Sequence, residues 1–487
     1  AHAGARTLDF GAATVVPGLI DAHGHLLGLG LGLAQANLVG TTSKADVIAR
    51  LRSQEKMLEA GEWLLGRGWD QNDWPEKVFP TAADLDAAFP DRPVWIERVD
   101  GHAGWANSAA MKRVKRDLGG DWQPGGGRIE RAGGKPTGIF VDGAMALVDN
   151  VVAQASPDTA REALFRAMSE AAKLGLTGVH DAGVSAGTLA LYRELADAKR
   201  LPIRVYAMAD GDADALAALC RDGLYRHAGG RLEMRAVKLY ADGALGSRGA
   251  ALDEDYSDDQ GNRGLLVTEP PALAKAIGTA KRCGVQVAVH AIGDRGNREV
   301  LDAFAKAQPG AERRWRIEHA QVVRLADIPR FRELGVIASM QPTHATSDMP
   351  WAEDRVGPDR VLGAYAWRRF RDAGVRLAFG SDFPVEAVNP MYGLHSAVTR
   401  QDEKGEPRGG WYPNERVTAY EALRGFTLDA AYAGFAEKDL GSISAGKRAD
   451  FVVLSADPID AAPQALRGIA VLATYVDGVA VYTRPAR

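Results

Sequence analysis

Short apolar runs alternate with amphipathic stretches along most of the chain. The runs are rich in Val, Ile, Leu and Ala, the pattern of buried strands. The stretches between them repeat apolar residues with a helical period, as in 157–174, 272–283 and 327–334. Eight runs are separated in this way: 15–21, 178–181, 203–208, 235–240, 285–290, 316–319, 336–340 and 377–381.

Alternating strands and helices predict parallel strands joined by crossover helices, which is an α/β architecture. Eight such units favour a closed TIM-type (β/α)8 barrel, with an open sheet as the alternative. The chain has 487 residues, whereas such a barrel needs roughly 250. Extra segments are therefore expected around the barrel.

The first gap between strands is far too long for one crossover helix. Residues 27–156 are rich in Trp, Gly and Pro and contain WDQNDW at 69–74. They are expected to form a large insertion after the first strand, either as a lid subdomain over the barrel mouth or as additional scaffold. The barrel is assigned to 14–26 and 157–435. Strand-like runs at 450–454, 470–476 and 479–482 make 436–487 a small β appendage.

Charge and composition narrow the classes of function. The net charge of −4 gives no electrostatic footprint for nucleic acid or for an anionic membrane surface. No apolar run reaches the roughly 18 residues that span a bilayer. Cys220 and Cys283 form no CxxC pattern, so they are expected to pack as small apolar residues rather than to form a disulfide or a thiolate metal site.

Imidazole and carboxylate side chains fall where the predicted strands end. His23 and His25 form an HxH pair, and residues i and i+2 of a strand point to the same side, so both rings can bind one cation. His290, His319 and Asp382 each follow an apolar run and precede turn residues. Because the C-terminal ends of barrel strands converge on one mouth, all five side chains are predicted to form one metal site.

Lys238 lies inside an apolar predicted strand. A charged amine is costly there unless it is paired or modified. It either pairs with a carboxylate such as Asp242 or carries a carbamate that bridges two metal ions, and the neighbouring metal ligands favour the carbamate.

Four residues near the predicted mouth are candidates for contacting a substrate. His102 and Trp69 lie in the insertion, and Asp242 and Arg248 lie on a Gly-rich loop. Each also has a structural interpretation: a loop histidine, a core aromatic, or a member of an ion pair. His180, at another strand end, is interpreted as a buried, hydrogen-bonded histidine.

Taken together, these motifs resemble the amidohydrolase superfamily and, within it, the YtcJ-like branch that includes N-substituted formamide deformylase. The resemblance extends over nearly the whole chain. It is carried by VVPGLIDAHGH (15–25), GWDQNDW (68–74), DGHAGWANSAAM (100–111), KLYADGALGSRGA (238–250), HAIGDRGN (290–297), IEHAQ (317–321), GSDFPVE (380–386) and GSISAGKRADFVVL (441–454).

The resemblance implies a binuclear metal site. Zinc is the expected metal, and manganese, nickel and iron are alternatives that also accept imidazole and carboxylate ligands. Carbamylated Lys238 bridges the two ions. The remaining ligands that the resemblance assigns are His23, His25 and Asp382 for one ion and His290 and His319 for the other.

The expected reaction is hydrolysis of a C–N bond in a small amide-type molecule, an N-formyl or N-acyl amine. A metal lowers the pKa of bound water towards about 7, so hydroxide is available to attack the carbonyl carbon. Asp382 is the candidate general base and acid, taking the water proton and returning it to the leaving nitrogen. The alternatives are a mononuclear deaminase or cyclic amidase on the same barrel, and a non-catalytic barrel relative. GLGLGLA at 28–34 does not indicate a dinucleotide site, because Leu33 replaces the third glycine of GxGxxG.

The resemblance also implies a small β-sandwich built from both ends of the chain. Residues 1–13 are expected to be a remnant of it whose N-terminal part is missing, and 436–487 its C-terminal segment. A cytoplasmic location is favoured, with a processed, exported form as the alternative. A homodimer is the assembly considered beside the monomer.

Overall fold

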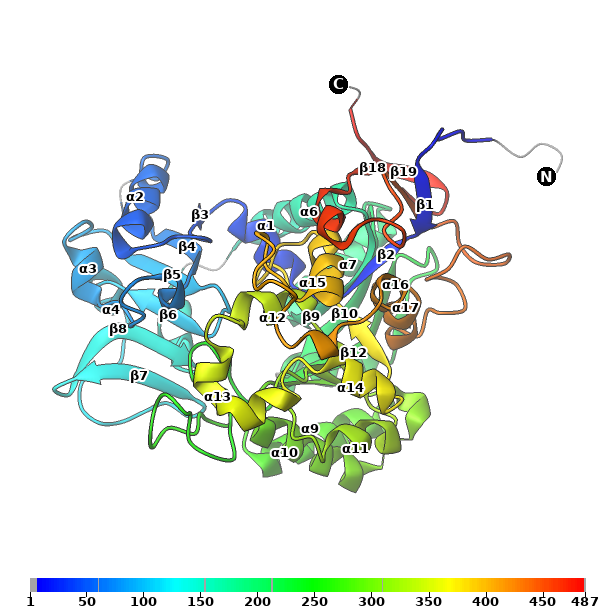
Figure 1. Ribbon diagram of the computed structural model, residues 1–487. Coiled ribbons are helices and arrows are strands. Elements are labelled where there is room, and N and C mark those ends of the chain that lie inside the picture. The colour runs from blue at the N-terminus through cyan, green and yellow to red at the C-terminus, as the bar shows by residue number, and fades with distance from the viewer. Residues whose placement is uncertain (1–6, 60, 153–154, 212, 309, 486–487) are drawn as a thin grey trace.

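A barrel of eight parallel strands forms the centre of the molecule (Figure 1). The computed structural model describes residues 7–59, 61–152, 155–211, 213–308 and 310–485. The strand order confirms the predicted α/β barrel. In chain order the strands are β2 (Leu19–Gly24), β9 (Leu176–Val184), β10 (Arg204–Asp210), β12 (Leu232–Tyr240), β13 (Gln286–Ala291), β14 (Arg316–His319), β15 (Ile337–Met340) and β16 (Leu377–Phe379).

The barrel is nearly closed where β16 approaches β2. The two strands share no regular ladder, but the backbone N–H of Asp382 donates to the carbonyl of His23 at 2.7 Å. The Ser381 hydroxyl donates to the Asp21 carboxylate at 2.6 Å. These bonds fix the last strand end against the first, so the histidines of β2 lie next to Asp382. A short strand, β11 (Tyr225–Arg226), pairs with β12.

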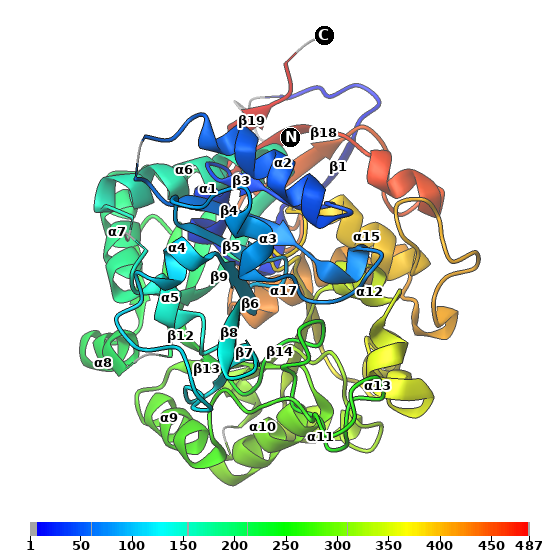
Figure 2. The ribbon, with the colours of Figure 1, turned by 90° about the vertical axis from the view of Figure 1, so that its left-hand side faces the viewer.

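Helices surround the barrel, as Figure 2 shows in projection. α6 illustrates how they form: the Ser156 hydroxyl accepts the backbone N–H of Thr159, Pro157 occupies the first turn, and an Ala-, Leu- and Met-rich face is buried. None of the described helices is long and apolar enough to cross a membrane. The helices are α1 (Leu26–Gly32), α6 (Pro157–Lys173), α7 (Ala186–Asp197), α8 (Ala213–Asp222), α9 (Pro270–Arg282), α10 (Asp294–Ala307), α11 (Ile328–Leu334), α12 (Pro342–Asp348), α13 (Ala352–Arg360), α14 (Trp367–Asp372), α15 (Pro390–Thr399), α16 (Ala419–Gly425) and α17 (Leu428–Ala433).

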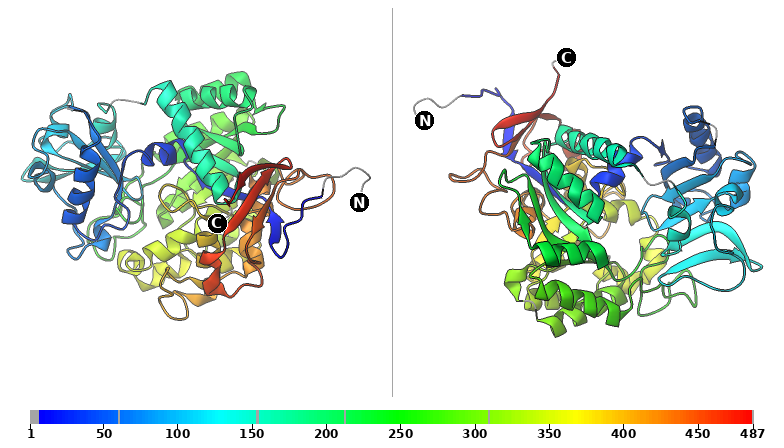
Figure 3. Two further views of the ribbon diagram at one scale, coloured as in Figure 1. Left: turned by 90° about the horizontal axis from the view of Figure 1, so that it is seen from above. Right: turned by 180° about the vertical axis from the view of Figure 1, so that it is seen from behind.

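The chain ends form a second, antiparallel sheet on the side of the barrel away from the insertion (Figure 3). The predicted run 15–21 proves to be two strands, because the chain leaves this sheet at Gly18 and enters the barrel. A Cβ at Gly18 would lie 2.3 Å from the Thr177 hydroxyl, so only glycine allows this passage. The first six residues of the predicted remnant 1–13 lie outside the described residues. The sheet contains β1 (Thr14–Pro17), β17 (Phe451–Leu454), β18 (Val471–Val476) and β19 (Val479–Thr483).

Most of residues 27–156 form a third sheet with its own core, which lies over one end of the barrel (Figure 2). Trp69, Trp74 and Trp105 pack against one another there, and each indole N–H donates to a backbone carbonyl. The strands, in spatial order, are β3 (Ala36–Asn37), β4 (Leu64–Trp69), β5 (Val94–Arg98), β6 (Ala103–Ala106), β8 (Lys135–Asp142) and β7 (Gly127–Ala132), accompanied by α2 (Lys44–Glu55), α3 (Ala82–Asp86), α4 (Ser108–Met111) and α5 (Ala146–Asp149).

The expectation for the two cysteines is wrong. Cys220 in α8 and Cys283 at the end of α9 form a disulfide, with their Cα atoms 5.1 Å apart. Successive helices of a barrel are neighbours on its outer surface, so residues distant in sequence can meet there. The sequence spacing alone carries no sign of this contact.

Candidate active site

The predicted strand-end side chains converge at the barrel mouth. Asp382 lies at the centre of the group: its Oδ1 is 2.9 Å from Nε2 of His25 and 3.5 Å from Nε2 of His23. Its Oδ2 faces the other way, 3.7 Å from Nε2 of His344. Burial alone would raise the pKa of Asp382, but His23 and His25 outweigh burial and hold that pKa well below its usual range. The carboxylate is therefore ionised and faces imidazoles on both sides.

The two histidines of the HxH pair are each fixed through their second ring nitrogen. His25 Nδ1 is 3.0 Å from the carbonyl of Ala182, and His23 Nδ1 is 2.5 Å from Oε2 of Glu318. Such partners orient metal-binding imidazoles and set which nitrogen is free to bind. In both residues Nε2 is the nitrogen directed at Asp382.

Glu318 belongs to a buried polar chain inside the barrel that the sequence analysis missed. Arg316, two residues earlier on β14, makes an ion pair with Glu318 at 2.7 Å and reaches His180 Nδ1 at 2.9 Å. Burial raises the pKa of Glu318, but Arg316 and His23 lower it more, so this carboxylate also stays ionised. Charged residues at alternate positions of an otherwise apolar strand were the available signal. The interpretation of His180 as a buried, hydrogen-bonded histidine is confirmed.

Lys238 lies beside His23 of the HxH pair rather than in a salt bridge with Asp242. Its Nζ is 3.2 Å from His23 Nε2, and the side chain is buried. Burial lowers the pKa of the amine. Asp242 instead accepts the backbone N–H groups of Ala251, Ile292 and Gly293.

His290 and His319 complete the cluster. Their ring centroids are 4.6 Å apart, and His319 is 4.9 Å from His23. His319 and Asp382 have φ angles of 72° and 61°, in the left-handed region that non-glycine residues rarely adopt. Such strain costs about 1–3 kcal/mol per residue and is typical of functional sites. His319 Nδ1 bonds to Gln341 Oε1 at 2.9 Å, which fixes the ring.

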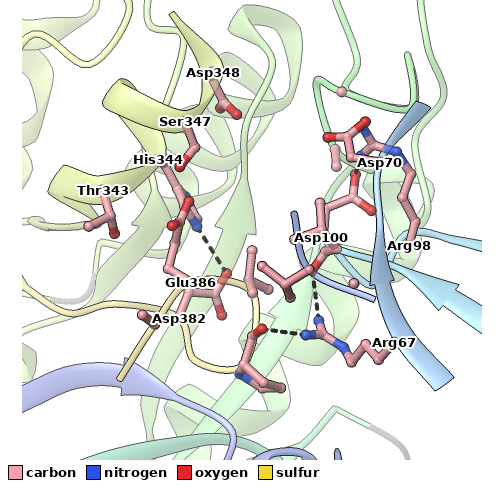
Figure 4. A pocket seen from close by; sticks show the side chains of 18 of the residues that line it. Arg67, Asp70, Arg98, Asp100, Thr343, His344, Ser347, Asp348, Asp382 and Glu386 are labelled. Carbon is pink, nitrogen blue, oxygen red and sulfur yellow. Dashed lines mark hydrogen bonds and ion pairs between the residues drawn. The ribbon is translucent and has the colours of Figure 1, made fainter. Parts of the chain in front are cut away.

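A cavity of about 870 Å³ opens between this cluster and the insertion. Figure 4 shows Arg67, Asp70, Arg98 and Asp100 on the insertion side, facing residues of the barrel side that include Asp382. Arg98 is buried and binds Asp70, Asp100 and Gln71. The wall opposite the cluster is therefore made of paired charges.

The four predicted substrate-contacting residues lie in different environments. His102 lines the cavity, with its ring centroid 5.1 Å from that of His290. Trp69 is buried in the core of the insertion and is not part of the cavity wall. Asp242 anchors the backbone beneath the site, as its three N–H bonds show. Arg248 pairs with Asp258 at 2.9 Å, a structural ion pair rather than a cavity contact.

The residues present fit a divalent metal ion. The ligand atoms of His23, His25 and Asp382 lie within 4.8 Å of one another, and those of His319, His344 and Asp382 do so as well. Among the described residues, His344 Nε2 is buried and has no hydrogen-bond partner. Imidazole nitrogens and carboxylate oxygens are ligands suited to zinc and to other first-row transition metals. The sequence pattern assigns His344 no role, because this residue lies four positions beyond the predicted strand 336–340 and not at its end.

Comparisons with known proteins agree with this architecture. The amidohydrolase family matches residues 6–482. The chain is 34% identical over 482 residues to a proposed amidohydrolase, YtcJ of Bacillus subtilis (strain 168), covering 98% of this chain and 90% of that protein. It is 32% identical over 504 residues to the N-substituted formamide deformylase of Arthrobacter pascens, covering 99% and 90%.

A solved structure is similar as well. The crystal structure of an uncharacterized metal-dependent hydrolase from Pyrococcus horikoshii OT3 matches with a TM-score of 0.75 and 29% identity, over 93% of this chain and 88% of that one. The predicted resemblance is confirmed by these relatives, and both the sequence and the three-dimensional match extend over the barrel and the insertion together. The chain therefore belongs to the amidohydrolase family, a conclusion that its barrel and strand-end histidines had already indicated.

Proposed function

We propose that the protein hydrolyses the C–N bond of an N-formyl or N-acyl amine with metal ions held at the barrel mouth. The observation that carries the proposal is the convergence of His23, His25 and Asp382 on one point, with Lys238 and His319 beside it. The similarity to an N-substituted formamide deformylase supports this substrate class.

We assign two metal positions to the cluster. His23, His25 and Asp382 would hold one ion, and His290 and His319 would hold the other. Lys238 would join the two as a carbamate, and its buried position favours the neutral amine that reacts with carbon dioxide. When bound, the metal supplies a Lewis acid for the amide carbonyl and lowers the pKa of water towards about 7. Zinc is the proposed metal.

Asp382 has the position of the proton carrier. Its carboxylate lies at the floor of the cavity and is ionised, so it can accept a proton from water and return that proton to the leaving nitrogen. Its left-handed backbone and its bond to the His23 carbonyl hold it in one place. His102, on the opposite side, is within the cavity and is the proposed contact to the substrate.

The cavity has room for a substituent on the amide. A volume of about 870 Å³ is well above what a formyl group occupies and is in the range of sites that enclose drug-sized ligands. Leu29, Leu33 and Val39 line part of it. These side chains favour an apolar substituent.

A mononuclear enzyme is the second candidate. The group of His23, His25 and Asp382 is complete without Lys238. A single ion there would suit a deaminase or a cyclic amidase on the same barrel. The products distinguish the reactions, because deamination releases ammonia and amide hydrolysis releases a carboxylate and an amine.

The test begins with metal content by elemental analysis of protein purified without chelator, followed by a screen of N-formyl and N-acyl amines. About two ions per chain and release of formate or another carboxylate are expected. The variant His290→Ala should fold but lose one ion and most of the hydrolysis. One ion per chain with ammonia release would replace the proposal by the mononuclear alternative. Full activity in His290→Ala would contradict the binuclear assignment.

A further inference from the structure

The insertion contributes one imidazole to the region above the strand-end cluster. His102 lies in the turn between β5 and β6, where the Asp100 carboxylate accepts the His102 backbone N–H at 3.0 Å. Its ring lies tilted beside that of His290, and its side chain, which lines the cavity, is 21% exposed. His102 is thus placed to reach whatever binds over the cluster.

Asp142 fixes the orientation of this imidazole. The Asp142 Oδ1 atom lies 2.6 Å from His102 Nδ1, and the Asp142 backbone N–H donates to the His102 carbonyl at 2.9 Å. Because Nδ1 is engaged, Nε2 is the ring nitrogen left for a ligand in the cavity. A carboxylate behind a histidine commonly selects the tautomer and the direction of the ring in this way.

The geometry of Asp142 is costly for the fold. Its φ angle is 49°, in the left-handed region, and its Oδ2 atom is buried without a hydrogen-bond partner among the described residues. Backbone strain and an unsatisfied buried carboxylate oxygen both destabilise a protein. A side chain that served only the fold could avoid both costs, so the presence of Asp142 behind a histidine that lines the cavity points to function.

The barrel makes room for Asp142. A Cβ on Gly243 or on Gly249 would lie 2.5 Å from Asp142 Oδ2, so a side chain at either position would displace this carboxylate from its place beside the barrel loop. The carbonyl of Gly243 in turn lies 3.3 Å from His290 Nε2. Asp142 therefore stands where the insertion meets the loop that also contacts His290.

We propose that His102 hydrogen-bonds the reacting group of the substrate through Nε2, and that Asp142 is the residue that positions it. The insertion then supplies part of the catalytic machinery instead of only enclosing the cavity. The inference rests on the proposed function, because the carbonyl oxygen and the nitrogen of a scissile amide are both hydrogen-bonding groups. Asp142 touches neither group and acts only through His102.

The experiment compares His102→Gln, Asp142→Asn and the double variant as zinc-loaded full-length proteins. His102→Gln is expected to lower kcat about 100-fold, and Asp142→Asn about 10- to 100-fold, with KM changed little and metal content unchanged. The double variant should be no slower than His102→Gln, because residues that act as one unit are not additive. Independent, multiplicative losses would mean that Asp142 has a separate structural role and would overturn the proposal.

Binding of acetohydroxamate, an amide analogue with a metal-binding group, gives a readout that does not need turnover. Calorimetry should show weaker binding to both single variants, whereas Asp197→Asn, which alters the surface pair of Asp197 with His227 at 3.3 Å, should bind as the unmodified protein does. If no N-formyl or N-acyl amine is hydrolysed but both variants bind acetohydroxamate more weakly, the proposed substrate class fails and this inference stands. Unchanged binding and turnover in His102→Gln would overturn the inference even if Asp142→Asn fails to fold.

Discussion

The barrel mouth and the insertion wall face each other across one cavity, yet their polar groups are arranged differently. On the barrel side, imidazoles and a carboxylate from separate strand ends point their nitrogen and oxygen atoms at a common centre near Asp382. On the insertion side, charges are paired within the wall itself, as Arg98 is with Asp70 and Asp100. The barrel side therefore presents ligand atoms to the cavity, whereas on the insertion side Arg98 neutralises the carboxylates beside it.

This difference suggests a division of work. Strand ends are rigid and repeat around the barrel, so they can fix reacting groups to the accuracy that metal chemistry requires. The insertion can vary in shape without moving those groups, which suits a wall that selects the substrate. His102 is the exception, because it brings a wall residue next to His290.

Asp382→Asn is expected to have the largest effect on activity. The substitution removes the negative charge that faces both groups of histidines, and with it the proposed proton carrier, so kcat/KM should fall at least about 1,000-fold. Bound metal should also decrease. Glu403→Gln, at an exposed carboxylate on the cavity rim that is 67% exposed, is the matched control and should remain within a few-fold. Retention of activity in Asp382→Asn would contradict the view that the barrel side of the cavity holds the reacting groups.

Arg98→Met tests whether the wall is a separate unit. The substitution leaves the half-buried Asp70 and Asp100 without the buried cation that pairs with them, which should destabilise the insertion by about 3 kcal/mol. Hydrogen exchange should show faster opening of the third sheet, with metal content at the barrel mouth unchanged. Arg50→Met, at a surface pair with Asp46, should change stability by less than about 1 kcal/mol. Loss of metal in Arg98→Met would show that the two sides do not fold independently.

The barrel strands and the residues at their ends could be predicted from the sequence, because the pattern that indicates them is local. β14, predicted at 316–319, is Arg316–His319 in the structure. A strand has a period of two and ends at a turn, so the residue type at the end of each apolar run is visible without any tertiary information. His290, His319 and Asp382 stand at such strand ends, and the structure brings them together at the barrel mouth.

The remaining features depend on contacts between distant segments. For Glu318 the alternation with Arg316 on an apolar strand was visible, but its partner His23 lies on another strand and could not be predicted. His344 was missed because it belongs to a short helix rather than to a strand end. For Trp69 the sequence left a substrate contact and a core aromatic as alternatives, and the residue lies in the core of the insertion. These positions follow from packing, which a single sequence does not encode as a repeat.

Removing the disulfide changes the stability of the barrel without altering either side of the cavity. Cys220→Ser should lower the free energy of unfolding by about 2–4 kcal/mol, since the bridge closes a long loop in the unfolded chain. Cys283→Ser should cost the same, and the double variant no more than either. Activity should be retained, because the bridge joins helices on the outer surface of the barrel. Two reactive thiols in the denatured, unreduced protein would contradict the bond.

Two carboxylates on opposite sides of the cavity, Asp100 and Glu386, differ in their pKa values. Burial raises the pKa of Asp100, but Arg98 outweighs burial and lowers it. Glu386, on the barrel side, is close to Asp348 and Asp382, and burial together with these carboxylates raises its pKa to about 8. Asp100 on the insertion side is therefore held ionised, whereas Glu386 on the barrel side keeps its proton at neutral pH.

Glu386→Gln measures that difference through its pH dependence. The folded protein keeps this proton up to about pH 8, whereas an unfolded glutamate loses it near pH 4.3. Stability should therefore fall as pH rises through this window, and the loss should be complete above it. The glutamine variant cannot titrate, so its thermal midpoint should equal that of the unmodified protein near pH 4 and exceed it by about 5 °C at pH 9. If the thermal midpoints of the two proteins changed in parallel with pH, Glu386 would be ionised in the folded state, as Asp100 is.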